Sequence, residues 1–143
     1  MDRKIILYWL FIFASILFGI ATIGLGVYLF LNGRDCRSYN DYSCAFRAMF
    51  SAIVIPYGLV ILLFVGLTNL QNKTASLIGS VLSALLGLFH LGMCCVIALG
   101  AASNAGDSLM SSEMGRFLLF PLAVFAGGVS LFGVGVLGFL RTK

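Results

Sequence analysis

The sequence predicts an all-α integral membrane protein in which four transmembrane helices form an up-down-up-down antiparallel bundle. Its 143 residues are 61% hydrophobic and 10% charged, with a mean hydropathy of +1.09, whereas soluble domains are about half apolar and a quarter charged. The chain also contains four uncharged stretches, each long enough to cross a bilayer core about 30 Å thick, which takes roughly 20 residues. These observations predict a chain with little mass outside the lipid.

The four stretches form one predicted transmembrane domain over residues 1–143. Its spans are 5–31, 48–70, 75–102 and 117–140. Lipid offers the backbone no hydrogen-bond partner, so a span is a helix or part of a closed barrel, and long runs without two-residue alternation favour helices. The loops are 32–47, 71–74 and 103–116. Because the second loop is so short, its two helices must be antiparallel neighbours.

The composition also excludes several classes of function. Disorder requires low hydrophobicity, and a net charge of +4 spread over loops and ends gives no basic face for nucleic acid. No Asp, Glu, Lys or Arg falls within a predicted span, so the charged groups of ion-coupled transport and intramembrane catalysis are missing. We therefore expect a protein that is not an enzyme and that has no cofactor, no catalytic residues and no metal site.

The distribution of Lys and Arg gives a small preference for one orientation. The two termini and the second loop carry five of these residues, against four in the first and third loops, and cytoplasmic loops are enriched in them. The first loop also carries a cysteine pair, which suits an oxidising compartment. We expect a multi-pass protein of the plasma membrane or an endomembrane, with both termini in the cytoplasm.

The first loop is the exposed segment best suited to recognition. Cys36 and Cys44 are separated by seven residues, and a disulfide between them would fix the shape of the loop; two free thiols are the alternative. Between them lie side chains of a type favoured at binding surfaces, although an ordinary solvated loop carries the same residues: Tyr39, Asn40, Asp41 and Tyr42.

The single histidine of the chain, His90, lies near the middle of the third span. An ionisable group inside a membrane is a candidate for a proton site, a ligand contact or an interhelical hydrogen bond. Ser83, Gly87, His90 and Cys94 recur at spacings of four, three and four, which places them on one helix face. That spacing favours a packing histidine on a helix seam over a site in a pore.

Small residues recur along the first, third and fourth spans at the spacings that allow helices to approach closely in lipid. The candidate packing residues are Ser15, Gly19, Gly26, Gly79, Ser83, Gly87, Gly128, Gly133 and Gly135. The pattern does not distinguish packing within the chain from packing against a partner.

Four spans, short termini, a cysteine-bearing loop and a first span that reads FGIATIGLGVYLF resemble the small tetraspan membrane proteins, which include tetraspanins, claudin-like proteins and the MARVEL group. Val96 follows Cys94-Cys95 where tetraspanins have the glycine of their Cys-Cys-Gly motif, and no claudin Gly-Leu-Trp precedes Cys36. The resemblance implies no functional residues. It implies a role as a lateral organiser or as an auxiliary subunit of a channel, receptor or transporter.

We therefore expect a non-enzymatic auxiliary or structural subunit of a larger membrane complex, or a lateral organiser. Its expected contacts are the glycine-lined helix faces and the short disulfide-closed loop. The expected partners are membrane lipids and either a larger membrane protein complex or further copies of the chain, with no nucleic acid. The alternative is an oligomeric pore or small transporter with His90 in the pathway, and an intramembrane enzyme is the least favoured hypothesis.

Overall fold

The computed structural model is all-helical and describes residues 3–34, 42–104 and 114–142. Side chains are described in these ranges except at 33–34, 42–46, 48, 97–98, 100–104 and 114–120. The helices are α1 (Arg3–Arg34), α2 (Tyr42–Thr68), α3 (Lys73–Asn104) and α4 (Met114–Thr142). All four are long and apolar enough to cross a membrane, which confirms the predicted helical class and the four predicted spans.

The helices α1, α3 and α4 extend past both predicted bounds of their uncharged stretches, whereas α2 begins early and ends at Thr68, two residues before the predicted end of its span at residue 70. The largest difference is at α2, which begins at Tyr42, six residues before the predicted start of the span at residue 48. Arg47 ended the uncharged stretch, but a charged side chain that reaches the membrane interface does not stop a helix. The predicted loop 32–47 therefore includes the first turn of α2, and the predicted loop 71–74 includes the start of α3 at Lys73.

The turn between α2 and α3 is closed by its own backbone and by Asn72. The N–H groups of Asn69 and Leu70 donate to the carbonyls three residues earlier, at 3.1 and 3.2 Å. The Oδ1 of Asn72 accepts from the N–H of Thr74 at 3.0 Å, and the carbonyl of Asn72 accepts from the N–H of Ser76 at 2.9 Å. This is the usual arrangement of an N-cap residue, so α3 starts one residue after Asn72.

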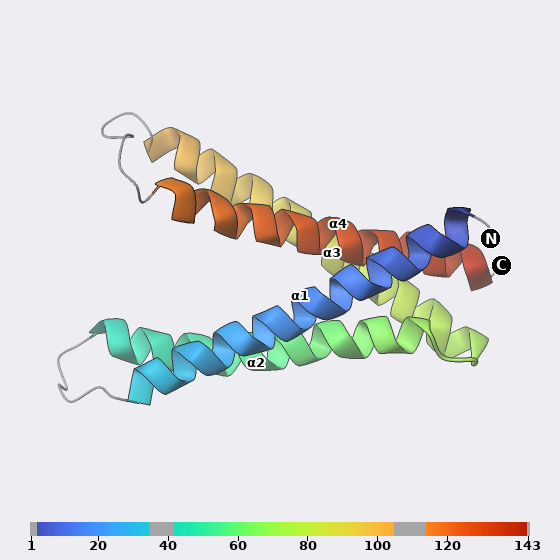
Figure 1. Cartoon of the computed structure of the whole chain (residues 1–143), viewed down its shortest axis with the longest axis horizontal. Coiled ribbons are helices and arrows are strands. Elements are labelled where there is room, and N and C mark those ends of the chain that lie inside the picture. Colours follow the sequence, from blue (N-terminus) through green and yellow to red (C-terminus); the bar gives the residue numbers. More distant parts are fainter. Residues whose placement is uncertain (1–2, 35–41, 105–113, 143) are drawn as a thin grey trace.

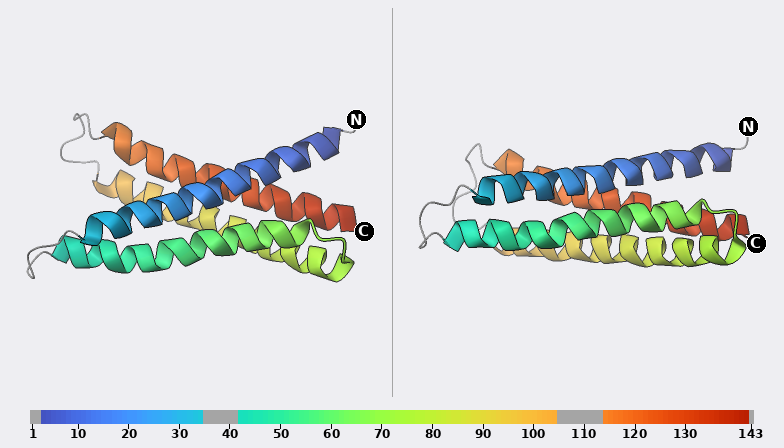
Figure 2. Two further views of the ribbon diagram at one scale, coloured as in Figure 1. Left: turned by 60° about the horizontal axis from the view of Figure 1, so that its bottom comes forward. Right: turned by 90° about the horizontal axis from the view of Figure 1, so that it is seen from below.

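The helices form two closely packed pairs, α1 with α2 and α3 with α4. The pairs cross each other, as Figures 1 and 2 show, and α1 also packs on α4 while α2 packs on α3. Both ends of the described chain and the α2–α3 turn lie at one end of the molecule, which we call the terminal end (Figure 1). Toward the opposite end the two pairs diverge (Figure 1).

Glycines lie where two backbones approach within the α1–α2 pair. A Cβ on Gly19 would lie 2.7 Å from Leu62 Cδ2, and one on Gly26 would lie 2.5 Å from Ile55 Cγ1. From the other helix, a Cβ on Gly58 would lie 2.9 Å from the carbonyl oxygen of Gly19. The first helix of the pair therefore packs through the small residues that the sequence predicts for it.

The α3–α4 pair is held in the same way. A Cβ on Gly87 would meet the backbone N of Phe132, and one on Gly135 would lie 2.5 Å from the backbone N of Ala84. Gly128 faces the Cβ of His90. No side chain separates the two backbones at these points, so α3 and α4 are in close contact over this length.

Two further candidate glycines join the pairs to each other. A Cβ on Gly79 of α3 would lie 2.7 Å from the backbone N of Thr68 on α2, and one on Gly133 of α4 would lie 2.6 Å from the Phe11 ring of α1. All of the predicted packing glycines thus contact other helices of the same chain. By contrast, a Cβ on Gly24, Gly66 or Gly92 would meet nothing within 4 Å.

Adding a methyl group at Gly135 should loosen the α3–α4 pair. The new Cβ of Gly135→Ala would lie 2.5 Å from the backbone N of Ala84 and 2.6 Å from the carbonyl oxygen of Ser80, so the backbones must move apart. Overpacking of this kind costs about 1–3 kcal/mol. We expect the purified protein to unfold at a lower temperature in detergent micelles.

The matched control is Gly92→Ala, which adds the same methyl group to α3 where nothing lies within 4 Å. Its unfolding temperature should stay level or rise, because Ala favours a helix more than Gly does. Equal unfolding temperatures for the two variants would contradict the close approach at Gly135.

Candidate functional site

Two clusters within the described residues link all four helices, and each contains buried polar side chains. The first cluster, which we call the central junction, consists of Phe18, Tyr57, His90, Gly127 and Gly128. It takes one or two residues from each helix. Three ring contacts and two hydrogen-bonding residues, Tyr57 and Leu86, converge on His90, so the predicted intramembrane residue lies where all four helices meet.

His90 is 5% exposed, and both nitrogens of its ring have partners. Nδ1 lies 2.8 Å from the carbonyl oxygen of Leu86. A carbonyl can only accept, so Nδ1 carries the hydrogen and donates it. Nε2 is then the acceptor of the neutral ring, and the hydroxyl of Tyr57 donates to it at 3.0 Å. A neutral histidine in this position leaves no polar atom unpaired in the lipid phase.

Aromatic rings surround the imidazole. The Phe18 ring meets it edge-on, with the ring centroids 5.4 Å apart and the planes at 74°. The Tyr57 ring is tilted by 30° at 5.5 Å, and Phe89 lies at 6.3 Å. Such pairs contribute about 0.5–1.5 kcal/mol beyond their buried area. The central junction therefore combines one hydrogen bond between helices, from Tyr57 to His90, with the packing of aromatic rings.

The glycine pair on α4 makes room for this cluster. A Cβ on Gly127 would lie 2.5 Å from Cζ of Phe18, and a Cβ on Gly128 would lie 2.9 Å from the Cβ of His90. Two adjacent residues of a helix face different directions, so Gly127 admits a ring from α1 while Gly128 admits α3. A larger residue at Gly128 would push α3 away, because it would meet the Cβ of His90 and the carbonyl oxygen of Gly87, whereas a larger residue at Gly127 would displace the Phe18 ring.

The other residues predicted to share the face of His90 are also turned toward the rest of the bundle. Gly87 contacts α4, and Ser83 is fully buried. Cys94 has a free thiol, which donates to the carbonyl of Pro121 at 3.5 Å. The spacing of four, three and four therefore places these residues on a buried seam, as the sequence analysis expects.

The second cluster, the terminal junction, consists of Tyr8, Thr68, Asn69, Ser76 and Arg141. The carbonyl of Thr68 ends α2 and has no helical partner. It accepts from the Ser76 hydroxyl of α3 at 2.8 Å, and the Tyr8 hydroxyl of α1 lies 3.5 Å away. The same Tyr8 hydroxyl lies 3.3 Å from Oδ1 of Asn69, and the guanidinium of Arg141 lies 5.6 Å from the centre of its ring. All four helices are linked here too.

Two buried hydroxyls of the described chain have no hydrogen-bond partner. These are Ser15 Oγ on α1 and Ser83 Oγ on α3, and both side chains are fully buried. Both positions are candidate packing residues. A serine is small enough to allow close helix contact, and an unpaired hydroxyl is the cost of that fit.

The predicted loop site falls mostly outside the described residues. Those that are not described at all are Cys36, Tyr39, Asn40 and Asp41. Tyr42 and Cys44 belong to the first turn of α2 rather than to a loop, and their side chains are not described. The disulfide between Cys36 and Cys44 and the recognition role of the loop stay predictions.

The geometry also adds residues that the sequence analysis does not select. Tyr57 is the partner of His90, and Tyr8 is buried at 4% although its neighbour Trp9 is 54% exposed. A signal for the first was present: Tyr57 precedes the buried residues Ile61, Val65 and Thr68 at spacings of four, four and three, which places it on the inner face of α2. Across the described ranges, no three His, Cys, Asp or Glu side chains come together to hold a metal ion.

The hydrogen bond between Tyr57 and His90 should be measurable as a coupling energy. In a double-mutant cycle of Tyr57→Phe and His90→Leu, the losses in the free energy of unfolding should differ from additivity by about 0.6 kcal/mol, the average for side-chain hydrogen bonds between membrane helices, and by no more than about 1.7 kcal/mol. The measurement is reversible unfolding by an anionic detergent in mixed micelles.

Tyr28→Phe is the matched control for this cycle. Tyr28 is 64% exposed, so the loss of its hydroxyl should not couple to His90→Leu. Additive losses for Tyr57 and His90 would show that the bond contributes nothing to the fold.

The chain was compared with protein-family models, with curated proteins and with solved structures, and none of them matches it. The resemblance to small tetraspan proteins is therefore neither supported nor contradicted, and only the geometry of the described residues bears on the function.

Proposed function

We propose that this chain is a non-enzymatic small tetraspan membrane protein, which acts as an auxiliary or structural subunit, or lateral organiser, of a larger membrane complex. In this proposal the helices cross the membrane up-down-up-down, with both termini in the cytoplasm, in the plasma membrane or an endomembrane. One observation carries the proposal. The polar side chains at the central and terminal junctions bond to other groups of the bundle, and the outer surface is left apolar.

The apolar outer surface is large. Exposed Leu, Ile, Val, Phe and Met side chains occur on all four helices. In water such a surface would aggregate, whereas in a bilayer it contacts lipid tails and the helices of other membrane proteins. A partner in the membrane can therefore bind without first breaking a polar contact of the chain.

The packing of the four helices against one another decides which surfaces remain available to that partner. The predicted packing glycines are covered by other helices of the chain, so they serve the fold and are not free for a partner. The open glycines Gly24, Gly66 and Gly92 lie on three different helices and permit close approach from outside.

The segment from Cys36 to Cys44, closed by a disulfide, is the second proposed contact, on the side of the membrane opposite to the termini.

Purification from the native membrane in a mild detergent tests the proposal. We expect the chain to co-purify with a larger membrane protein in a constant ratio. Filling the open faces with Gly24→Leu, Gly66→Leu and Gly92→Leu, one at a time, should lower the co-purified fraction at one or more positions, because a partner helix can no longer approach the backbone.

The control for these variants is the unfolding temperature, which should not fall at a face that contacts nothing in the chain. A chain that purifies alone, from native membranes and at native abundance, would overturn the auxiliary role.

A second candidate function is an oligomeric pore or small transporter with His90 in the pathway. The specific observation in its favour is the presence of the unpaired buried hydroxyls of Ser15 and Ser83 in the same bundle as the His90–Tyr57 pair. Hydroxyls and an imidazole can line a water path without fixed charges.

Ion flux distinguishes the two functions. Vesicles that contain the purified protein should hold a proton gradient as well as protein-free vesicles do, as followed with an entrapped pH dye. A proton leak that disappears in both His90→Ala and His90→Gln would instead favour the pore, because Gln keeps a hydrogen-bonding side chain and lacks only the titrating ring.

A further inference from the structure

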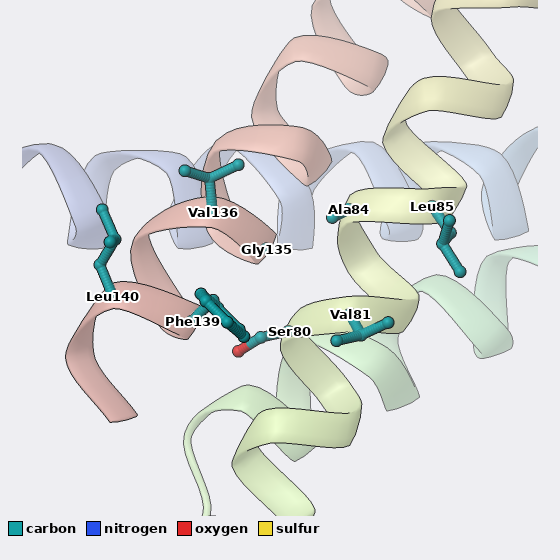
Figure 3. A pocket seen from close by; sticks show the side chains of 8 residues that line it. All are labelled: Ser80, Val81, Ala84, Leu85, Gly135, Val136, Phe139 and Leu140. Atoms are coloured by element: carbon teal, nitrogen blue, oxygen red, sulfur yellow. The ribbon is translucent and has the colours of Figure 1, made fainter. Parts of the chain in front are cut away.

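An apolar groove runs between α3 and α4 on the outside of the described bundle. It has a volume of about 240 Å³. Its lining residues, labelled in Figure 3, are Ser80, Val81, Ala84, Leu85, Gly135, Val136, Phe139 and Leu140. The groove adjoins the close approach of Ala84 to Gly135, where small residues leave the surface hollow.

The groove offers no polar group to an occupant. The one hydroxyl of its lining, that of Ser80, donates to the carbonyl of Ser76 at 2.8 Å and is already satisfied. The walls are apolar side chains on both helices, among them Val81, Val136 and the ring of Phe139 (Figure 3). An occupant at this depth of the membrane must therefore be a hydrocarbon chain or an apolar side chain.

The size of the groove favours a single chain over a helix. Its α3 side runs from Ser80 to Leu85, a rise of about 7.5 Å, which is less than the 10–12 Å diameter of a helix with its side chains. A docked helix would need a longer furrow to make contact over several turns. A few methylene groups of a lipid acyl chain fit along a groove of this length.

Positive charge lies beyond one end of the groove. The lining residues Ser80 and Leu140 place this end of the groove toward the start of α3 and the end of α4, and Lys73 is the first residue of α3. Lys73 precedes Ser80 by seven residues, which is about two turns and 10 Å, and thus occupies the same helix face. Arg141 follows Leu140 on α4, but its guanidinium lies over the Tyr8 ring on the α1 side.

The charge at this end is not balanced by the described residues. Arg3, Lys4, Lys73 and Arg141 are its cations, and residues 3–34, 42–104 and 114–142 contain no Asp or Glu. A cation at the membrane surface attracts anionic lipids by about 1 kcal/mol per Lys or Arg. The apolar groove and the lysine on its helix face match the two ends of one phospholipid.

We propose that the α3–α4 groove binds one acyl chain of an anionic phospholipid, whose headgroup phosphate is bound by Lys73. The site requires the helices to lie in a membrane and does not depend on the proposed auxiliary role. It would give the terminal end a preferred lipid, in addition to the general layer of lipid around the bundle.

Native mass spectrometry of the full chain tests the site. The protein, in a mild detergent, is titrated with dioleoyl phosphatidylglycerol and, separately, with dioleoyl phosphatidylcholine. The first bound lipid should be the anionic one. Lys73→Gln should weaken its binding about fivefold, the equivalent of 1 kcal/mol, and should weaken the zwitterionic lipid less, because the choline ammonium offsets the charge of its phosphate. Val136→Phe fills the groove from its rim and should weaken both.

Two matched variants test whether the effect belongs to this groove. Lys4→Gln removes a charge from the same end on α1, and Val129→Phe enlarges an exposed residue of α4 outside the groove lining; both should bind lipid like the unchanged protein. If Val136→Phe lowers the unfolding temperature, Val81→Phe on the facing wall replaces it.

Three results would overturn the proposal. The first is equal binding of the two lipids by the unchanged protein. The second is a loss of anionic lipid in Lys4→Gln as large as that in Lys73→Gln, which would show a diffuse charge effect. The third is a dimer of the chain that Val136→Phe dissociates, which would show that a second copy occupies the groove.

Discussion

Helices in lipid gain nothing from hydrophobic exclusion, because the lipid tails are as apolar as their side chains. Contact therefore depends on how closely the backbones approach, and in this chain glycine sets that distance. Gly19 and Gly58 bring α1 against α2, and Gly87 and Gly135 bring α3 against α4. The polar junctions follow from this approach, since Tyr57 can reach His90 only while the pairs remain in contact. Small residues thus permit the close approach of the backbones, and that approach permits the hydrogen bonds between helices.

The two polar junctions differ in what they stabilise. At the terminal junction, hydroxyls of Tyr8 and Ser76 approach the carbonyl that ends α2, which fixes the helix ends where water is near. At the central junction the His90–Tyr57 bond lies among rings and satisfies groups that lipid would leave unpaired. Away from the terminal end the pairs diverge (Figure 1).

Hydropathy alone was enough to predict the four helices, because a span without charges has no other stable form in lipid. It placed the start of α2 six residues late, because a helix continues into the interface where charge is tolerated. Small-residue spacing identified the packing positions, but it could not say which helix each one meets. Tyr8 and Trp9 illustrate the remaining limit. Both fit an aromatic belt, and one residue of rotation, about 100°, buries the first and exposes the second.

The location of the small residues also decides what kind of contact the chain can offer. Had Gly87 and Gly135 faced outward, a partner helix would have been the natural occupant of their surface. They instead bind α3 to α4 and leave beside them a groove too short for a helix. The proposed recognition therefore rests on other features: the single open glycines, the groove between α3 and α4, and the first connecting segment that the sequence predicts.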